Sequence, residues 1–319
     1  MEENKEMLYI IVPCYNEEEA LQIFYPEAKW ELDAMQEPNN NLCWKILVID
    51  DGSNDNTLQV AKSLRLMDKR VHYLSFSRNF GKEAAICAGI QRALSDGADY
   101  IAVMDADMQD PPSLLPQMYQ GVIEEGYDCV ATRRKNRKGE PPIRSFFAHM
   151  FYRLINRISA TSVVDGARDF RFMTRQVAQA IISLKEYNRF TKGIYEWVGF
   201  KTKYLEYENI ERAAGDTKWS FWKLFKYSLE GIIAFSTAPL ALASIGGIVL
   251  CVVSFLTILF LIIRAAVFGD PVAGWPSLAC IVIFMGGIQL FCSGILGMYL
   301  SRTYLECKER PIYIIKEEV

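Results

Sequence analysis

Two long stretches without charged side chains constrain the fold of this 319-residue chain more than any other feature. Residues 231–263 and 271–301 contain no Asp, Glu, Lys or Arg, although charged residues are frequent up to about residue 212. A helix needs roughly 20 apolar residues to cross the hydrocarbon core of a bilayer. Both stretches exceed that length, so we expect two transmembrane helices, at about residues 240–263 and 276–300.

Basic residues predict how these two spans are oriented. The connecting segment carries one Arg and one Asp, whereas the other ends of the spans are flanked by Lys218, Lys223, Lys226, Arg302, Lys308 and Arg310. Lys and Arg accumulate on the cytoplasmic side of membrane helices. We therefore expect a multi-pass protein of the plasma (inner) membrane with both termini in the cytoplasm.

The remaining chain divides into a large domain, a short amphipathic segment and a tail. Residues 1–212 form the expected cytoplasmic domain, and residues 302–319 follow the second span as a cytoplasmic tail. Between domain and spans, residues 213–238 mix aromatic and basic side chains, which is typical of a helix lying in a membrane interface. The net charge of -3 argues against a strongly basic nucleic-acid binder. The eight cysteines are scattered, which argues against a zinc site.

Short apolar runs alternate with helical patterns in the first part of the chain. The runs occupy residues 7–12, 44–49, 71–76, 100–104 and 128–132. Helical patterns of ten or more residues follow the first four runs. This alternation is typical of an α/β fold of Rossmann-like type, a mainly parallel sheet with helices on both faces.

Polar clusters follow the carboxyl ends of the predicted strands. In chain order they are Tyr15 and Glu17; Asp50 and Asp51; Ser77 and Arg78; Asp105, Asp107 and Gln109; Arg133 and Arg134. Ligands of parallel sheets bind beyond this edge, so we expect these side chains to share one site. No G-x-G-x-x-G follows the first strand and no P-loop sequence occurs. That argues against nicotinamide-dependent oxidoreductases and P-loop phosphoryl transfer.

The segment Asp105-Ala-Asp-Met-Gln109 ends an apolar strand with two carboxylates. Anions in such a place need a compensating cation or hydrogen bonds. Carboxylate and amide oxygens suit Mg²⁺ or Mn²⁺, which commonly bridge protein and substrate phosphates. A polar surface turn is the alternative explanation for an isolated Asp-x-Asp. The arginines on the same edge suit phosphate groups, so the combined pattern favours a metal-bound phosphate substrate.

Seven ordered motifs together resemble the family 2 glycosyltransferases that act on polyprenyl phosphates. They are Pro13-Cys-Tyr-Asn-Glu17, Asp50-Asp-Gly-Ser53, Ser77-Arg-Asn-Phe-Gly-Lys82, Asp105-Ala-Asp-Met-Gln-Asp-Pro-Pro112, Asp169-Phe-Arg171, Asn188-Arg-Phe-Thr-Lys-Gly193 and Thr217-Lys-Trp219. The pattern is most similar to bacterial bactoprenol (undecaprenyl-phosphate) glucosyltransferases and more distantly to dolichol-phosphate mannose synthases. The resemblance covers essentially the whole chain, including both spans.

The resemblance implies a GT-A fold, a nucleotide-sugar donor such as UDP-glucose, and an undecaprenyl phosphate acceptor in the bilayer. Asp105, Asp107 and Gln109 would hold Mg²⁺ or Mn²⁺. Asp51 would bind the base of the donor, and the donor residues together would be Pro13, Tyr15, Glu17, Asp51, Arg78, Lys82 and Asp105. Arg133 and Arg144 would meet the acceptor phosphate. Relatives often carry a Ser where this chain has Ala148, so nearby Ser145 is a candidate for that contact.

The implied reaction depends on charge stabilisation more than on a general base. The metal and the basic groups would stabilise the departing nucleotide diphosphate. The acceptor is itself a largely dianionic phosphate, so in-line attack would proceed with inversion at the anomeric carbon. The catalytic candidates are Asp169, Arg133 and Arg144. Asp169 would orient the sugar or the acceptor, and its alternative is a structural ion pair with Arg171 or Arg168.

Several alternatives stay open at this point. The sugar could instead be N-acetylglucosamine, 4-amino-4-deoxyarabinose or mannose. A processive polysaccharide synthase should show more spans and a Gln-x-x-Arg-Trp signature, and the chain has neither. A non-catalytic membrane protein that binds nucleotide sugars is disfavoured by the complete set of acidic and basic residues. The resemblance also implies a homo-oligomer, such as a homotetramer.

Overall fold

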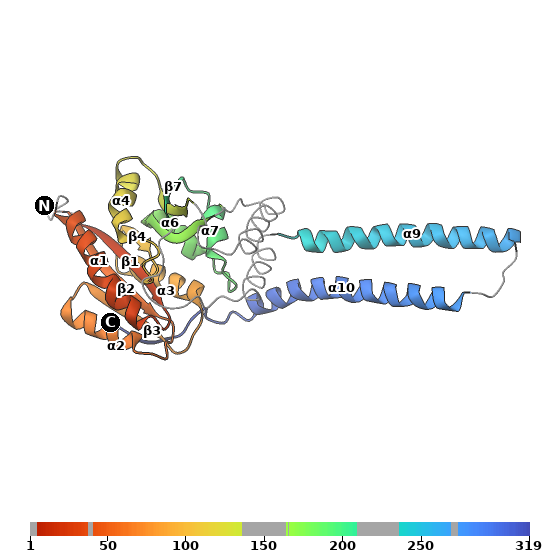
Figure 1. The fold of residues 1–319 in the computed structure, drawn as a ribbon, viewed down its shortest axis with the longest axis horizontal. Coiled ribbons are helices and arrows are strands. Elements are labelled where there is room, and N and C mark those ends of the chain that lie inside the picture. The colour runs from red at the N-terminus through yellow and green to blue at the C-terminus, as the bar shows by residue number, and fades with distance from the viewer. Residues whose placement is uncertain (1–4, 38–40, 136–163, 165, 209–235, 269–273) are drawn as a thin grey trace.

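The computed structural model describes residues 5–37, 41–135, 164, 166–208, 236–268 and 274–319. A domain built on a sheet carries a hairpin of two long helices that projects from one side of it (Figure 1). Three of the expected features fall partly or wholly outside the described residues. They are Arg144, Ser145 and most of the predicted interfacial segment 213–238.

One sheet forms the centre of the domain, with strand order β7-β5-β6-β4-β1-β2-β3-β8. Four strands, β1 (Glu6–Cys14), β2 (Leu42–Asp50), β3 (Val71–Phe76) and β4 (Tyr100–Val103), lie parallel to one another. The others are β5 (Cys129–Arg134), β6 (Ala167–Thr174), β7 (Thr202–Tyr207) and β8 (Ile315–Glu318). The predicted α/β class with a mainly parallel sheet is thus confirmed.

Helices cover both faces of this sheet, because alternate residues of the central strands point to opposite sides. Leu8, Ile10 and Val12 of β1 pack with α1 (Glu18–Gln36), α2 (Thr57–Met67) and α4 (Leu115–Ile123). A short 3-10 turn, Pro112–Leu114, leads into α4. Tyr9 and Ile11 pack with α3 (Lys82–Ser95), α6 (Arg175–Ser183) and α7 (Thr191–Trp197). Burial on both faces explains why β1 is apolar at nearly every position.

Strands β6, β7 and β8 were not predicted from the sequence. β6 lies between β4 and β5 and runs antiparallel to both of them. Its sequence, ARDFRFMT, carries three charged residues in eight and lacks the apolar run of a central strand. The charges are accommodated at a central position because each finds a partner on another element, as described below.

The two predicted spans fall within α9 (Ala238–Phe268) and α10 (Trp275–Cys307), and both helices extend beyond the predicted bounds. Each helix is long and apolar enough to cross a membrane. Large apolar side chains such as Leu242, Phe255 and Leu290 are more than half exposed along the hairpin. A continuous apolar surface of this length is unfavourable in water and is suited to hydrocarbon.

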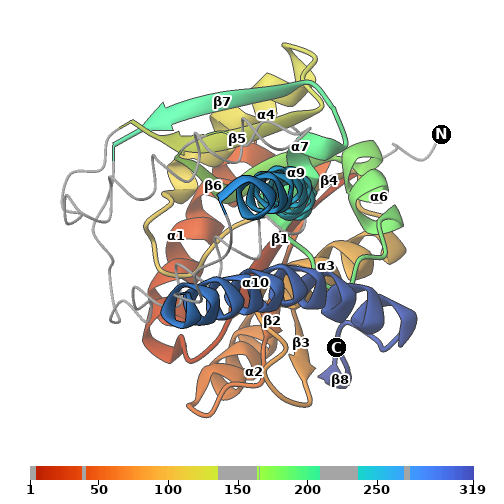
Figure 2. The ribbon, with the colours of Figure 1, turned by 90° about the vertical axis from the view of Figure 1, so that its right-hand side faces the viewer.

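The segment after the second span belongs to the sheet domain. The sequence predicted a cytoplasmic tail over residues 302–319, but α10 continues to Cys307 and β8 then pairs antiparallel with β3 (Figure 2). Two ion pairs reinforce the pairing: Lys62 with Glu317 and Arg92 with Glu318, each at 2.6 Å. The chain therefore returns from the helical hairpin and closes the edge of the sheet at β3.

Candidate active site

The polar residues predicted to share a site follow the carboxyl ends of four adjacent parallel strands. β1, β2, β3 and β4 end at neighbouring positions of one edge, since their register is continuous. The donor candidates at or just past these ends are Pro13, Tyr15, Glu17, Asp51, Arg78, Lys82 and Asp105. The structure therefore brings the predicted donor residues to the same edge of the sheet. Their contacts with a donor remain a prediction.

Asp105 and Asp169 are brought together by the antiparallel pairing of β4 with β6. Val103 pairs with Arg171, and continuing that register by two residues places Asp105 opposite Asp169. Lys82, the first residue of α3, contacts both carboxylates. Its Nζ lies 2.7 Å from Asp105 Oδ2 and 2.6 Å from Asp169 Oδ2. Three elements distant in sequence thus form one charged cluster.

Lys82 and Asp169 of this cluster hold each other in their charged forms at neutral pH. Burial by itself raises the pKa of Asp169, but Lys82, Lys192 and Arg168 outweigh burial and hold that pKa well below its usual range. Burial likewise opposes the charge on Lys82, yet Asp105 and Asp169 raise its pKa above the ordinary value. A carboxylate held so firmly ionised is a poor proton acceptor. Asp169 is therefore suited to orienting groups and to stabilising positive charge.

The two partners that the sequence suggested for Asp169 bind elsewhere. Arg168 donates from Nε to Asp110 Oδ1 and from Nη2 to Gln109 Oε1, both at 3.1 Å. Arg171 is buried, 3.5 Å from Glu196 Oε1, with its guanidinium 4.1 Å from the ring centroid of Tyr195. The alternative left open for Asp169, an ion pair with Arg171 or Arg168, is therefore not found, because the side chain of Asp169 is paired with Lys82.

Hydrogen bonds of two buried carboxylates stabilise the loop that carries the predicted metal ligands. Asp107 is buried and its Oδ1 accepts the backbone N–H of Gln109 at 3.2 Å. Asp110 is also buried and accepts from Arg168 and from the hydroxyl of Tyr207. Sequence reasoning assigned no role to Tyr207 or to the pair of Arg168 with Asp110. The position of Asp110, three residues past Asp-x-Asp, was the only local signal.

The donor set of this loop fits a hard divalent cation. Asp105, Asp107 and Gln109 offer two carboxylates and one amide, which are the oxygen ligands that Mg²⁺ and Mn²⁺ prefer. In the described part of the chain, no three or more His, Cys, Asp or Glu residues gather as a metal-binding group. Two carboxylates are few for a closed metal site. The set instead suits an ion that shares its coordination with substrate phosphates.

Asp51 holds the loop after β3 against the loop after β2. Its Oδ1 accepts the N–H of Phe80 at 2.6 Å and its Oδ2 the N–H of Gly81 at 2.9 Å. Gly52 lies at φ +66, and a Cβ there would meet the carbonyl carbon of Arg78 at 2.4 Å. Burial raises the pKa of Asp51 to about 6, although the two N–H donors act in the opposite direction. Its predicted contact with the base of the donor stays a prediction.

Arg133 is the described member of the predicted acceptor set. It lies near the end of β5 and pairs in register with Ala167, two residues before Asp169. Arg133 is half-buried at the same edge of the sheet as the Asp105–Lys82–Asp169 cluster. Arg144 and Ser145 lie outside the described residues, so the acceptor contacts as a set stay a prediction.

The family model described as "Glycosyl transferase family 2" matches residues 9–182, from within β1 to the end region of α6, and so includes the carboxyl ends of β1 to β4. The chain belongs to glycosyl transferase family 2. It is 41% identical over 311 residues to the "Putative glycosyltransferase CsbB" of Bacillus subtilis (strain 168), covering 98% of this chain and 92% of that protein. The predicted family resemblance is therefore confirmed.

Other relatives of this glycosyltransferase carry more specific names. It is 41% identical over 307 residues to the "Prophage bactoprenol glucosyl transferase homolog" of Escherichia coli (strain K12), covering 96% of this chain and 97% of that one. It is 40% identical over 309 residues to the "Bactoprenol glucosyl transferase" of Shigella phage SfV, with 97% and 98% covered. Among solved structures, glucosyl-3-phosphoglycerate synthase from Mycobacterium tuberculosis aligns with a TM-score of 0.45 and 15% identity, over 72% and 78% of the two chains.

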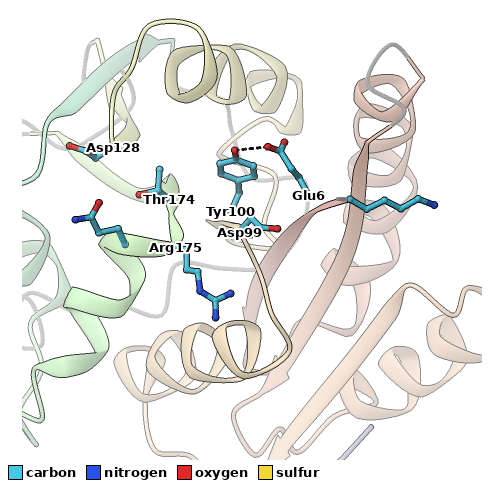
Figure 3. A pocket seen from close by; sticks show the side chains of 8 residues that line it. Glu6, Asp99, Tyr100, Asp128, Thr174 and Arg175 are labelled. Carbon is cyan, nitrogen blue, oxygen red and sulfur yellow. Dashed lines mark hydrogen bonds between the residues drawn. The ribbon is translucent and has the colours of Figure 1, made fainter. Parts of the chain in front are cut away.

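Two surface cavities lie at opposite edges of the glycosyltransferase sheet. One of about 350 Å³ adjoins the candidate site and is lined by Arg78–Ala84, by residues 187–189 and by Ile312. The other, of about 360 Å³, lies at the amino ends of β1 and β4, where Tyr100 donates to Glu6 at 3.2 Å (Figure 3). Only the first includes a member of the Asp105–Lys82–Asp169 cluster, so we assign the site to that edge.

Proposed function

We propose that this glycosyltransferase moves a sugar, with glucose as the first candidate, from a UDP-sugar to undecaprenyl phosphate at the cytoplasmic face of the plasma membrane. The observation that carries the proposal is the position of the Asp105–Lys82–Asp169 cluster beside the base of the helical hairpin. Lys82 lines the cavity that Tyr187 also lines, and the N–H of Tyr187 donates to Glu306 of α10 at 3.0 Å. A site in this place can receive a nucleotide from the cytoplasm and a phosphate from the membrane surface.

The full-length similarity to proteins named bactoprenol glucosyl transferases supports the same acceptor and the same sugar. The similarity extends over both apolar helices, which a soluble acceptor would not require. Exposed apolar surface along α9 and α10 supports a membrane anchor with two spans. We propose in addition that the sheet domain and both termini are cytoplasmic and that the protein forms a homo-oligomer, such as a homotetramer.

The metal part of the proposal rests on oxygen ligands that the loop after β4 provides. Asp105, Asp107 and Gln109 would hold Mg²⁺ or Mn²⁺, which supplies Lewis-acid stabilisation of the charge that develops on the departing diphosphate. Arg168 fixes the amide of Gln109 and the carboxylate of Asp110, so the loop is ordered before a ligand binds. Such preorganisation reduces the cost of binding.

The reaction transfers the sugar without removal of a proton. An oxygen of the acceptor phosphate forms a bond to the anomeric carbon while the bond from that carbon to the donor diphosphate breaks. UDP departs with the electron pair, and the configuration at the anomeric carbon inverts. Because the attacking phosphate is already an anion, no general base is needed. Asp169, held ionised by Lys82, would orient the sugar and stabilise the positive charge that develops on its ring.

The other predicted residues divide between donor and acceptor. Arg133, Arg144 and Ser145 would bind the acceptor phosphate, with the arginines matching its charge and geometry. The donor nucleotide and diphosphate would contact Pro13, Tyr15, Glu17, Asp51, Arg78 and Lys82.

A transfer assay with the full chain in detergent or nanodiscs tests the function. The protein is supplied with undecaprenyl phosphate, Mn²⁺ or Mg²⁺, and one of a panel of donors: UDP-glucose, UDP-N-acetylglucosamine, GDP-mannose or UDP-4-amino-4-deoxyarabinose. We expect lipid-linked sugar to form with UDP-glucose and Asp107→Asn to reduce its rate by about 100-fold or more, because a metal ligand is lost. Formation of product with none of the donors, or an unchanged rate in Asp107→Asn, refutes the proposal.

A further inference from the structure

Lys82 occupies an unusual position for a residue of a donor site. Its single ammonium group is shared between Asp105, a predicted metal ligand, and Asp169, a predicted catalytic residue. The Lys82 side chain is 42% exposed, whereas Asp105 and Asp169 are 22% and 19% exposed. The lysine therefore covers the two carboxylates from the solvent side and has room to change its rotamer.

Binding of a metal cation to Asp105 competes with the ion pair between Lys82 and Asp105. The ammonium already engages Oδ2 of Asp105 at 2.7 Å, so an ion on the same carboxylate would stand within a few ångströms of a positive charge. Like charges at such a distance repel, and the repulsion is only partly screened in a half-buried site. In the absence of other ligands, Lys82 therefore weakens binding of the metal.

The diphosphate of a donor reverses this relationship. It brings negative charge that both the metal and an ammonium can contact, so the two cations acquire a common partner. Lys82 begins α3 and is preceded by Gly81 at φ +99, so its side chain starts at the helix N-terminus, a favourable place for phosphate groups. Moving from Asp105 to the diphosphate also leaves that carboxylate oxygen available to the ion.

We propose that Lys82 neutralises Asp105 in the donor-free enzyme and yields it to the metal when a nucleotide diphosphate binds, so that metal and donor bind cooperatively. This inference rests on the proposed function for the identity of the site, and it adds how the site is regulated. Metal held without donor would be an unproductive state, which the lysine suppresses. By linkage, the metal must increase the affinity for the diphosphate by the same factor as the diphosphate increases that for the metal.

Substitution of Lys82 separates this role from simple donor binding, because the two predict opposite effects on the metal. Lys82→Met should bind Mn²⁺ alone about tenfold more tightly than the unaltered protein, since one repelling charge is lost. In the presence of saturating UDP the same variant should bind Mn²⁺ no more tightly than the unaltered protein does. The reason is that the contact between Lys82 and the diphosphate is lost as well. Lys82→Arg keeps the charge and should retain most of the cooperativity.

The experiment is an Mn²⁺ titration of the full chain in nanodiscs, followed by the electron paramagnetic resonance signal of free Mn²⁺, with and without UDP. Lys203→Met is the matched control. Lys203 lies on β7, away from the site, and its Nζ is 2.6 Å from Glu125 Oε1. This variant should leave both Mn²⁺ affinities unchanged. If Lys82→Met does not fold, Lys82→Gln removes the same charge and keeps a hydrogen-bond donor.

Two results overturn the inference. The first is that Lys82→Met binds Mn²⁺ alone no more tightly than the unaltered protein does. The second is that UDP increases the Mn²⁺ affinity of Lys82→Met as much as it increases that of the unaltered protein. Neither measurement uses a nucleotide-sugar donor or the undecaprenyl phosphate acceptor, so a failure here differs from a failure of the transfer reaction. Absence of lipid-linked sugar with normal Mn²⁺–UDP cooperativity would refute the proposed function alone.

Discussion

The ring of Tyr313 is stacked on the ring of Phe76, with centroids 5.1 Å apart and an interplanar angle of 16°. Phe76 ends β3, and Tyr313 lies between α10 and β8. The hydroxyl of Tyr313 also donates to Gln91 Oε1 of α3 at 2.8 Å. One side chain thus joins the segment that follows the helical hairpin to a strand and a helix that lead into the active-site edge.

Tyr313→Ala should lower the free energy of unfolding of the sheet domain by about 1–2 kcal/mol, because the half-buried ring stacked on buried Phe76 and a hydrogen bond are lost. Tyr313→Phe keeps the stacked ring and should cost only about 0.5–1 kcal/mol. Denaturant titration in detergent, followed by far-ultraviolet circular dichroism, measures both. Equal losses in the two variants would show that the ring contact contributes nothing.

Glu306 links the end of α10 to the loop before α7. Its carboxylate accepts the N–H of Tyr187 at 3.0 Å and that of Asn188 at 3.5 Å. Glu306→Gln should raise the KM for undecaprenyl phosphate by about threefold or more, because neutralising the acceptor weakens the hydrogen bonds that hold the site next to the hairpin. The affinity for UDP-glucose should not change. Exposed Glu309 provides the matched control, Glu309→Gln, for which both values should equal those of the unaltered protein.

Gly52 should tolerate no side chain. Gly52→Ala combines a positive φ with a Cβ that meets the backbone of Arg78 at 2.4 Å, so the loops after β2 and β3 must separate. Gly97→Ala is the matched control, since Gly97 also has a positive φ but nothing lies within 4 Å of its Cβ. We expect about 1–2 kcal/mol of destabilisation at Gly97 and a clearly larger loss at Gly52. Thermal unfolding measures the difference, and similar losses would exclude the clash as a cause.

Donor affinity should fall at acidic pH because of Asp51. Its pKa lies at about 6, so the native carboxylate takes up a proton as the pH falls through that value. Protonation turns one of the two carboxylate oxygens into a hydroxyl, so acceptance from Phe80 or Gly81 weakens and the loop beside the donor loosens. From pH 7 to pH 5 the affinity for UDP-glucose should fall by up to about tenfold. UDP-glucose is a diester without a titrating phosphate in this range, so the change belongs to the protein.

Asp51→Asn provides the control for this pH dependence. The variant should bind UDP-glucose more weakly at pH 7, because the amide nitrogen of Asn cannot accept a backbone N–H. Its affinity should then change little down to pH 5. Calorimetric titration at several pH values measures both proteins. A variant that keeps the full pH dependence would show that another group is responsible.

Local sequence patterns were sufficient for the parallel half of the sheet and for the two long apolar helices. β3 runs over Val71–Phe76, as the apolar run indicated, and the four parallel strands end where polar clusters begin. These features are readable because each depends on neighbouring residues: an apolar run long enough for a strand or a span, followed by groups that need water or a ligand. The edge that holds the candidate site follows from the same rule.

The antiparallel strands could not be predicted because their residues are stabilised by distant partners. Arg168, Asp169 and Arg171 are improbable residues for a central strand, yet Asp110, Lys82 and Glu196 compensate them. β8 gives a related case, since its pairing with β3 spans more than two hundred residues of chain. Nothing in the local pattern records such contacts.

The sequence by itself determined that this protein has a carboxylate-rich edge of a parallel sheet and two apolar helices, because strand and helix periodicity are local properties. Only the tertiary structure decided which charges meet there. The antiparallel insertion of β6 beside β4 sets Asp169 opposite Asp105, and the start of α3 brings Lys82 between them. Buried charges require a partner in three dimensions, and the fold supplies that partner from a different element in each case.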